Sequence, residues 1–216
     1  MDHLNIARYN MTHHAYMWDV KDPILLELLK TTPREPFVSS AFQSVAYSDA
    51  FLPIGYGQVT LPPKLTARIL QALEISPQNR LLEIGTGTGY LTTLLARLGQ
   101  SVVTIEIIPE LARLAAINFS NLELSHIESR QGNGLQDWPK DTPYDTIILT
   151  GSVPALPLGL AEQLSVGGRL FAAVGNAPAM SAVVLERTGE NSWKKEVLFE
   201  TDIPPLQLTT SECFKF

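Results

Sequence analysis

Residues 81 to 106 constrain the fold of this chain more than any other segment. An apolar run at 81–84 leads into Gly85-Thr86-Gly87-Thr88-Gly89, and a second apolar run ends at Glu106. This arrangement is typical of the first β-α-β crossover of an open parallel sheet, in which ligands bind beyond the carboxyl ends of the strands. Alternate glycines let the backbone turn tightly and let a ligand approach it without meeting a Cβ atom. The segment therefore predicts an α/β fold with a ligand site at this edge of the sheet, although a purely structural glycine turn is the simpler alternative.

The spacing of acidic residues and glycines distinguishes two classes of ligand. A dinucleotide fingerprint reads G-x-G-x-x-G and holds a pyrophosphate at a helix N-terminus, but Tyr90 occupies its third glycine position here. Glu83 stands two residues before Gly85, and a carboxylate there suits an ammonium group and repels a phosphate. Glu106 ends the next strand, where an acidic side chain accepts hydrogen bonds from a ribose diol. The pattern predicts a site for S-adenosylmethionine.

Composition and charge exclude several classes of protein. The 216 residues are 45% hydrophobic and 18% charged, which is typical of a globular chain. A formal net charge of −6 argues against nucleic-acid binding, because such proteins neutralise phosphates with basic side chains. We see no secretory signal and no apolar run of the roughly 18 residues that a membrane helix needs, and the single Cys213 has no disulfide or metal partner. We expect a cytoplasmic protein with small-molecule or protein partners, without nucleic acid or membrane; the oligomeric state stays open.

Strands and helices alternate after Pro62. Apolar residues at helical spacing predict a helix from Pro63 to about Leu73. The elements expected beyond it are strand 81–84, helix 90–98, strand 101–106, helix 109–118, strand 126–131, strand 144–150, helix 157–164 and strand 168–174. Extended runs at 180–187 and 193–200 predict an antiparallel hairpin. We therefore expect a Rossmann-like α/β fold, with a mostly parallel sheet, helices on both faces and a C-terminal antiparallel hairpin; the order of the last two strands stays open.

The N-terminal part of the chain has a different character. Asp22-Pro23 before a leucine-rich run predicts a helix with an aspartate N-cap that ends near Pro33. Residues 36–61 predict an irregular loop that packs over a site. We divide the chain into an N-terminal helical extension with a substrate-side loop at 1–62 and a catalytic α/β domain at 63–216, joined in one compact unit.

Several motifs together resemble those of the protein-L-isoaspartate (D-aspartate) O-methyltransferases, over roughly residues 35–206. The matching segments are Leu52-Pro-Ile-Gly-Tyr-Gly-Gln58, Leu82-Glu-Ile-Gly-Thr-Gly-Thr-Gly-Tyr90, Val103-Thr-Ile-Glu-Ile-Ile-Pro-Glu-Leu111, Tyr144-Asp-Thr-Ile-Ile-Leu-Thr150 and Leu164-Ser-Val-Gly-Gly-Arg-Leu170. The glycine turn is general to adenosylmethionine enzymes, whereas the run at 52–58 is specific to this family. The resemblance implies a methyltransferase that repairs damaged proteins by methylating the free α-carboxylate of isoaspartyl residues, with S-adenosylmethionine as methyl donor and a protein or peptide as acceptor.

The resemblance also implies which residues hold the cofactor. They are Gln58, Glu83, Gly85, Thr86, Gly87, Gly89, Tyr90, Glu106, Ile107, Gly132, Asn133 and Thr150. Gly132-Asn133 matches a Gly-Asp pair at which the family contacts adenine. Asn133 keeps a carbonyl acceptor for the exocyclic amine but loses the charge.

The substrate side departs from the family pattern. After Gln58 the family reads Thr-Ile-Ser-x-Pro-His, whose serine and histidine face the reaction centre, whereas this chain reads Val59-Thr-Leu-Pro-Pro-Lys64. Leu61 has no hydroxyl for an incoming carboxylate, Lys64 could attract one by its charge, and Thr60 could supply a hydroxyl if the strand were shifted by one residue. These three are the candidate catalytic-side residues. No general base is expected, because an α-carboxylate with a pKa of about 3.5 is already ionised at neutral pH.

Three functions stay open at this point. They are an isoaspartyl carboxyl methyltransferase, a methyltransferase for a different acceptor, and an adenosylmethionine-binding protein without catalysis. The adjacent His13 and His14 have no carboxylate or thiolate cluster beside them, so we expect no metal site. Asp145 either caps a turn or lies at the cofactor edge of the sheet, and Trp138 and Tyr144 lie either in the core or beside the adenine.

Overall fold

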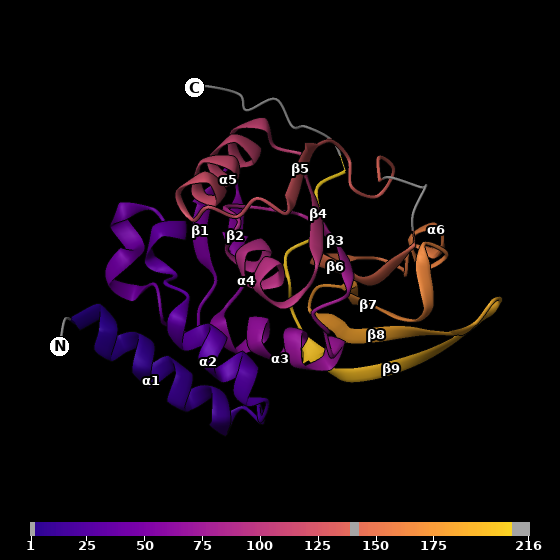
Figure 1. Ribbon diagram of the computed structural model, residues 1–216, viewed down its shortest axis with the longest axis horizontal. Coiled ribbons are helices and arrows are strands. Elements are labelled where there is room, and N and C mark those ends of the chain that lie inside the picture. Colours follow the sequence, from indigo (N-terminus) through magenta and orange to yellow (C-terminus); the bar gives the residue numbers. More distant parts are fainter. Residues whose placement is uncertain (1–2, 139–142, 209–216) are drawn as a thin grey trace.

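A seven-stranded sheet forms the centre of the computed structural model, which describes residues 3–138 and 143–208 (Figure 1). Its strands are β3 (Arg80–Ile84), β4 (Ser101–Glu106), β5 (Ile127–Gln131), β6 (Tyr144–Val153), β7 (Leu164–Asn176), β8 (Ala179–Gly189) and β9 (Ser192–Thr201). They lie in the order β5-β4-β3-β6-β7-β8-β9. Neighbours from β5 to β7 pair parallel, and β7, β8 and β9 pair antiparallel. The expected α/β fold is confirmed, and the last strand, β9, lies at the edge.

Side chains alternate between two buried faces along these strands. Leu81 and Phe171 belong to one hydrophobic cluster, while their neighbours Leu82 and Leu170 belong to another. A period of two with both faces buried is typical of parallel strands that are covered on each side. The first cluster contains residues from the first four helices, and the second contains Leu160 from a short helix on the other face.

Helices make up much of the described chain, and those for which the sequence predicts bounds begin close to the predicted start. They are α1 (His3–Met17), α2 (Pro23–Thr31), α3 (Pro63–Leu73), α4 (Tyr90–Leu98), α5 (Pro109–Asn121) and α6 (Leu158–Ala161), with two 3₁₀ helices, η1 (Glu35–Phe37) and η2 (Ser40–Val45). The Asp22 carboxylate accepts a hydrogen bond from the Ile24 amide at 2.8 Å and caps α2 as expected. The predicted helix at 157–164 was too long, because β7 already begins at Leu164. No helix in the described ranges is long and apolar enough to cross a membrane.

The segment expected as an irregular loop packs over the cleft described below, as predicted, but it contains a small hairpin, so the prediction of an irregular backbone was wrong. Strands β1 (Leu52–Gly55) and β2 (Gln58–Thr60) pair antiparallel. Gly55, Tyr56 and Gly57 all have positive φ angles, of 94°, 55° and 71°, which glycine adopts readily and which close the turn. Proline inside the first strand hid the pattern, since proline is tolerated at the edge of a sheet but is depleted from strands in general. Of the three substrate-side candidates, Thr60 ends this hairpin, Leu61 follows it and Lys64 lies in α3.

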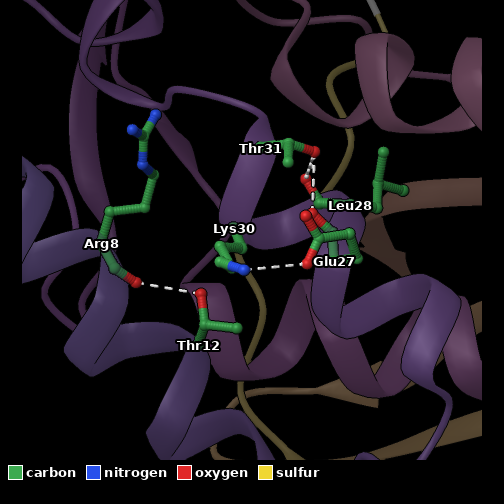
Figure 2. A network of polar contacts seen from close by, with 6 residues as sticks. All are labelled: Arg8, Thr12, Glu27, Leu28, Lys30 and Thr31. Carbon is green, nitrogen blue, oxygen red and sulfur yellow. Dashed lines mark hydrogen bonds and ion pairs between the residues drawn. The ribbon is translucent and has the colours of Figure 1, made fainter.

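Helices α1 and α2 lie beside α3 and α4 (Figure 1). Their surface polar contacts are local, as Figure 2 shows: the Thr12 hydroxyl donates to the Arg8 carbonyl at 3.0 Å, and Lys30 pairs with Glu27 at 3.1 Å. Exposed pairs of this kind contribute little to stability. Burial of apolar side chains therefore holds these helices against the rest of the molecule; they include Met11, Ala15, Leu25, Leu28 and Leu29.

Candidate functional site

An open cleft lies at the carboxyl ends of β3, β4, β5 and β6. The chain leaves β3 toward β4 on one side and later returns as β6 on the other, and such a switch point is where open α/β sheets bind ligands. The outer cleft, as we call it, encloses about 690 Å³ including the solvent at its mouth. It continues into an inner recess of about 410 Å³, and Gly85, Gly87 and Leu61 line both.

The glycine turn between β3 and α4 forms the floor of the cleft. Gly85 has a φ angle of 95°, and a Cβ atom there would lie 2.2 Å from the Thr150 hydroxyl oxygen. That hydroxyl donates to the carbonyls of Ile84 and Gly85 at 3.0 and 2.8 Å, so Thr150 supports the turn from β6. Gly89 lines neither part of the cleft; it precedes α4 at a φ angle of 90°, and its missing side chain leaves room for the Phe119 ring.

Glu106 at the end of β4 joins the turn to the next loop. Its carboxylate accepts hydrogen bonds from the Gly87 amide at 2.7 Å and the Ile108 amide at 3.0 Å. The side chain is buried yet lines the outer cleft. Burial raises the pKa of Glu106, and the backbone amides oppose that rise. The carboxylate thus lies where the sequence places an acceptor for a ribose diol.

Glu83 lies deeper, in the inner recess. One carboxylate oxygen, Oε2, accepts hydrogen bonds from the hydroxyls of Thr92 and Thr104 at 2.5 and 2.6 Å. Oε1 is buried and has no partner among the described residues. Burial raises the pKa of Glu83 to about 8, against the two hydroxyl donors. Thr86 joins the same network through its hydroxyl, 2.6 Å from that of Thr104. A cationic ligand group would supply the partner that Oε1 lacks.

The opposite wall of the outer cleft is apolar. It is formed by Ile105, Ile107, Ile108, Leu111 and Leu135. Gly132 donates its amide to the Glu106 carbonyl at 2.9 Å. The Asn133 side chain accepts from the Leu135 amide at 3.0 Å and donates to the Leu208 carbonyl at 3.1 Å. Asn133 therefore lines the cleft with part of its hydrogen-bonding capacity already used, and one carbonyl lone pair remains.

A C-terminal segment completes the cleft, and the sequence patterns did not predict it. Residues 203–207 line the outer cleft. The Ser152 amide donates to the Pro204 carbonyl at 2.9 Å, and the Leu206 amide donates to the Ser152 carbonyl at 3.0 Å. No motif marks this segment. Pro204-Pro205 in the sequence indicates that a strand ends there, but it does not predict the path of the chain beyond it.

The charges of the lining select the kind of ligand. Among the described lining residues of both parts, the charged ones are Glu83 and Glu106, and there is no lysine, arginine or histidine. A pyrophosphate would meet two carboxylates and no cation, whereas an ammonium group, a ribose and a flat apolar base each meet a suitable surface. The residues present therefore fit S-adenosylmethionine.

The three substrate-side candidates do not lie together. Thr60 lines the inner recess, and its hydroxyl makes no hydrogen bond with any described residue; Leu61 is buried and lines both parts, and Gln58 lines the outer cleft. Lys64 lines neither part. It borders a separate hollow, where its amide donates to the Asp49 carboxylate at 3.1 Å.

The remaining candidates lie in the recess wall or in the core of the molecule. Tyr90 is buried and borders the inner recess. Asp145 lies at the start of β6, away from the cleft, where it accepts from the Arg80 amide at 2.8 Å and the Ser165 hydroxyl at 2.6 Å. Trp138 and Tyr144 both pack in the second hydrophobic cluster. Within the described ranges no group of three or more histidine, cysteine or acidic residues is placed to hold a metal ion, and Cys213 lies outside the described residues.

Comparison with known sequences gives a consistent result. The family model described as protein-L-isoaspartate(D-aspartate) O-methyltransferase matches residues 12–207. A protein-L-isoaspartate O-methyltransferase of Magnetococcus marinus is 40% identical over 200 residues, which cover 93% of this chain and 88% of that protein. A second, from Geotalea uraniireducens, is 38% identical over 197 residues, covering 91% and 90%.

Solved structures share the fold. A structure described as a protein-L-isoaspartate O-methyltransferase superposes with a TM-score of 0.82 at 23% identity, covering 94% of this chain and 67% of that one. A Plasmodium falciparum structure, described as a putative enzyme of the same kind in complex with S-adenosyl-L-homocysteine, gives a TM-score of 0.79 at 17% identity, covering 94% and 99%. At these identities the likeness concerns the fold.

Proposed function

Because this chain belongs to the protein-L-isoaspartate(D-aspartate) O-methyltransferase family, we propose that it transfers a methyl group from S-adenosylmethionine to the free α-carboxylate of isoaspartyl residues in proteins. The observation that carries the proposal is the cleft itself, whose described lining has Glu83 and Glu106 as its charged residues and no cation. This lining accepts a positively charged cofactor and leaves the nucleophile to the substrate.

Each part of the cleft has a role in holding the cofactor. Glu83 Oε1 would accept a hydrogen bond from the methionine ammonium group, and Glu106 would accept from the ribose hydroxyls. The apolar wall, which includes Ile107 and Leu135, packs against the adenine, and Asn133 offers its remaining carbonyl lone pair to the exocyclic amine. The turn at Gly85 and Gly87 lets the cofactor lie close to the backbone.

The reaction requires positioning and no general base. Bound S-adenosylmethionine supplies an electrophilic methyl group on a sulfonium ion. The acceptor carboxylate has a pKa of about 3.5 and is already ionised at neutral pH, which agrees with a described lining that contains no histidine, cysteine or lysine. The protein holds the carboxylate in line and excludes water, and orientation of this kind is a major source of rate enhancement.

Thr60 and Leu61 form the acceptor side of the inner recess. The Thr60 hydroxyl has no partner among the described residues and donates a hydrogen bond to the acceptor carboxylate. The Leu61 side chain shields the recess from water. The N-terminal part of the chain up to residue 62 therefore acts as the acceptor-side cover of the α/β domain.

Methyl transfer to an isoaspartyl peptide, measured beside its normal aspartyl twin, tests the proposal. We expect methylation of the isoaspartyl peptide alone. Thr60→Val should lower kcat/KM by about tenfold, since a hydrogen bond to a charged group is lost, with unchanged cofactor affinity. Thr188→Val is the matched control, because Thr188 lies on the exposed β8–β9 hairpin, far along the strand from the cleft. A protein that binds the cofactor but methylates neither peptide would favour a methyltransferase for a different acceptor.

A further inference from the structure

Arg34 is a fully buried cation with no carboxylate partner. It lies just before η1, and its side chain is 0% exposed. One terminal nitrogen donates to the Ala46 carbonyl and the other to the Leu61 carbonyl, each at 2.6 Å. Nε has no partner, and none of the ion pairs among the described residues includes Arg34. The exposed Asp49 acts on it through space, beyond ion-pair distance.

The guanidinium group lies behind the wall of the inner recess. Its central carbon is 5.7 Å from the centre of the Tyr90 ring, and it holds the Leu61 carbonyl. Leu61 and Tyr90 both line the recess. Arg34 therefore lies one side chain away from the space in which the acceptor carboxylate is methylated, and it touches no ligand itself.

A buried charge of this kind calls for a physical reason. Burying a guanidinium group without a carboxylate is costly, and an apolar side chain of similar volume is often more stabilising in such a place. An arginine also keeps its charge when buried. Because the surrounding protein screens charge poorly, its field extends into the recess far more strongly than that of a surface lysine.

An anionic acceptor is attracted into the recess by a positive electric field of this kind. The charged residues in the described lining, Glu83 and Glu106, are both acidic, so the lining itself offers no cation to an incoming carboxylate. Lys64 borders a separate hollow. The charge on Arg34 is the positive charge that lies immediately behind the recess.

We propose that Arg34 is a positioning residue for the anionic acceptor: its charge, acting through the wall of Leu61 and Tyr90, makes the recess prefer a carboxylate over a neutral group. Its hydrogen bonds to the Leu61 and Ala46 carbonyls also tie the residue that follows β2, next to Thr60, to the end of η2. This inference rests on the proposed function and names the determinant by which the site selects a charged acceptor.

The test compares two ligands of the same shape and two variants. The ligands are an isoaspartyl peptide and its twin with the α-carboxylate replaced by a carboxamide. Arg34→Lys and Arg34→Gln both lose the guanidinium fork. Lysine keeps a positive charge when the titration is run at about pH 5, because burial lowers the pKa of a lysine. Calorimetric titration of protein loaded with S-adenosylhomocysteine should show that the parent prefers the carboxylate peptide. Arg34→Lys should keep the parent's ratio of affinities for the carboxylate and carboxamide peptides. In Arg34→Gln that ratio should fall about tenfold. Both variants should bind S-adenosylhomocysteine with similar affinity.

Other outcomes overturn the inference in distinguishable ways. If both variants keep the preference of the parent, the charge of Arg34 does not reach the acceptor. If both weaken the two peptides equally, Arg34 has a structural role alone. If the parent binds neither peptide, the proposed function itself fails. Should Arg34→Gln not fold, Arg34→Met fills similar space without charge and takes its place in the comparison.

Discussion

Replacing the buried Glu83 with glutamine should remove a pH dependence of stability from the cofactor-free protein. Glu83 has a folded pKa of about 8 against an ordinary value of 4.5, because it is buried. The folded protein therefore binds the proton more tightly than the unfolded chain does. The stability that Glu83 contributes is fully present below pH 4.5 and is lost as the pH rises toward 8. Between pH 4.5 and pH 7 the loss amounts to about 3 kcal/mol, and Glu83→Gln should not show it.

The same residue should couple cofactor binding to proton release. Glu83 must ionise to pair its Oε1 with the ammonium group, so the parent should release a proton from this site near pH 7. Glu83→Gln should bind S-adenosylmethionine more weakly and release fewer protons. Titration calorimetry in two buffers of different ionisation enthalpy measures the released protons, and urea unfolding from pH 4.5 to 8 measures the stability.

Glu123→Gln is the matched control, because Glu123 is exposed. It should leave both the proton release and the pH dependence as they are in the parent. The reasoning would be refuted if Glu83→Gln lost stability with rising pH as steeply as the parent does. It would also be refuted if the variant bound the cofactor with parental affinity and proton release.

Four further substitutions test the cleft and the residues around it. Glu106→Ala should weaken S-adenosylmethionine binding by about 1 to 3 kcal/mol in calorimetry, since the ribose hydroxyls lose a charged acceptor; unchanged affinity would remove Glu106 from the site. Leu61→Ser should raise kcat/KM for an isoaspartyl peptide about ten- to a hundredfold, because its hydroxyl would add a hydrogen bond to the acceptor beside that of Thr60. Lys64→Ala should leave the kinetics unchanged, because Lys64 borders a separate hollow. If Leu61→Ser left kcat/KM unchanged and Lys64→Ala lowered it, Lys64 would face the acceptor and Leu61 would not. Gly89→Ala should lower the free energy of unfolding by about 1 to 3 kcal/mol, because its Cβ would lie 2.5 Å from the Phe119 ring; denaturant unfolding measures this, and parental stability would contradict it.

The cofactor side of the site could be predicted from the sequence because its signals are local. The glycine turn follows a buried strand directly. Glu83 lies one residue before the end of β3, and Glu106 ends β4, which pairs parallel with β3. Carboxyl ends of parallel strands meet at one edge of a sheet, so the order of elements along the chain already places these residues together. The alternation of Leu81 and Leu82 between the two faces follows from the period of a strand in the same way.

Which residues line the acceptor side depends on contacts between segments that are distant in the sequence. The spacing of residues along the chain does not reveal such contacts. Lys64 was a candidate because of its position in a motif, yet the start of α3 turns it toward another hollow. No sequence pattern pointed to Arg34, because the carbonyls that its side chain binds lie 12 and 27 residues away along the chain. Residues 203–207 reach the cleft through hydrogen bonds to Ser152. Local periodicity thus determined the sheet and the cofactor edge, whereas the tertiary packing of the N- and C-terminal segments decided which side chains face the acceptor.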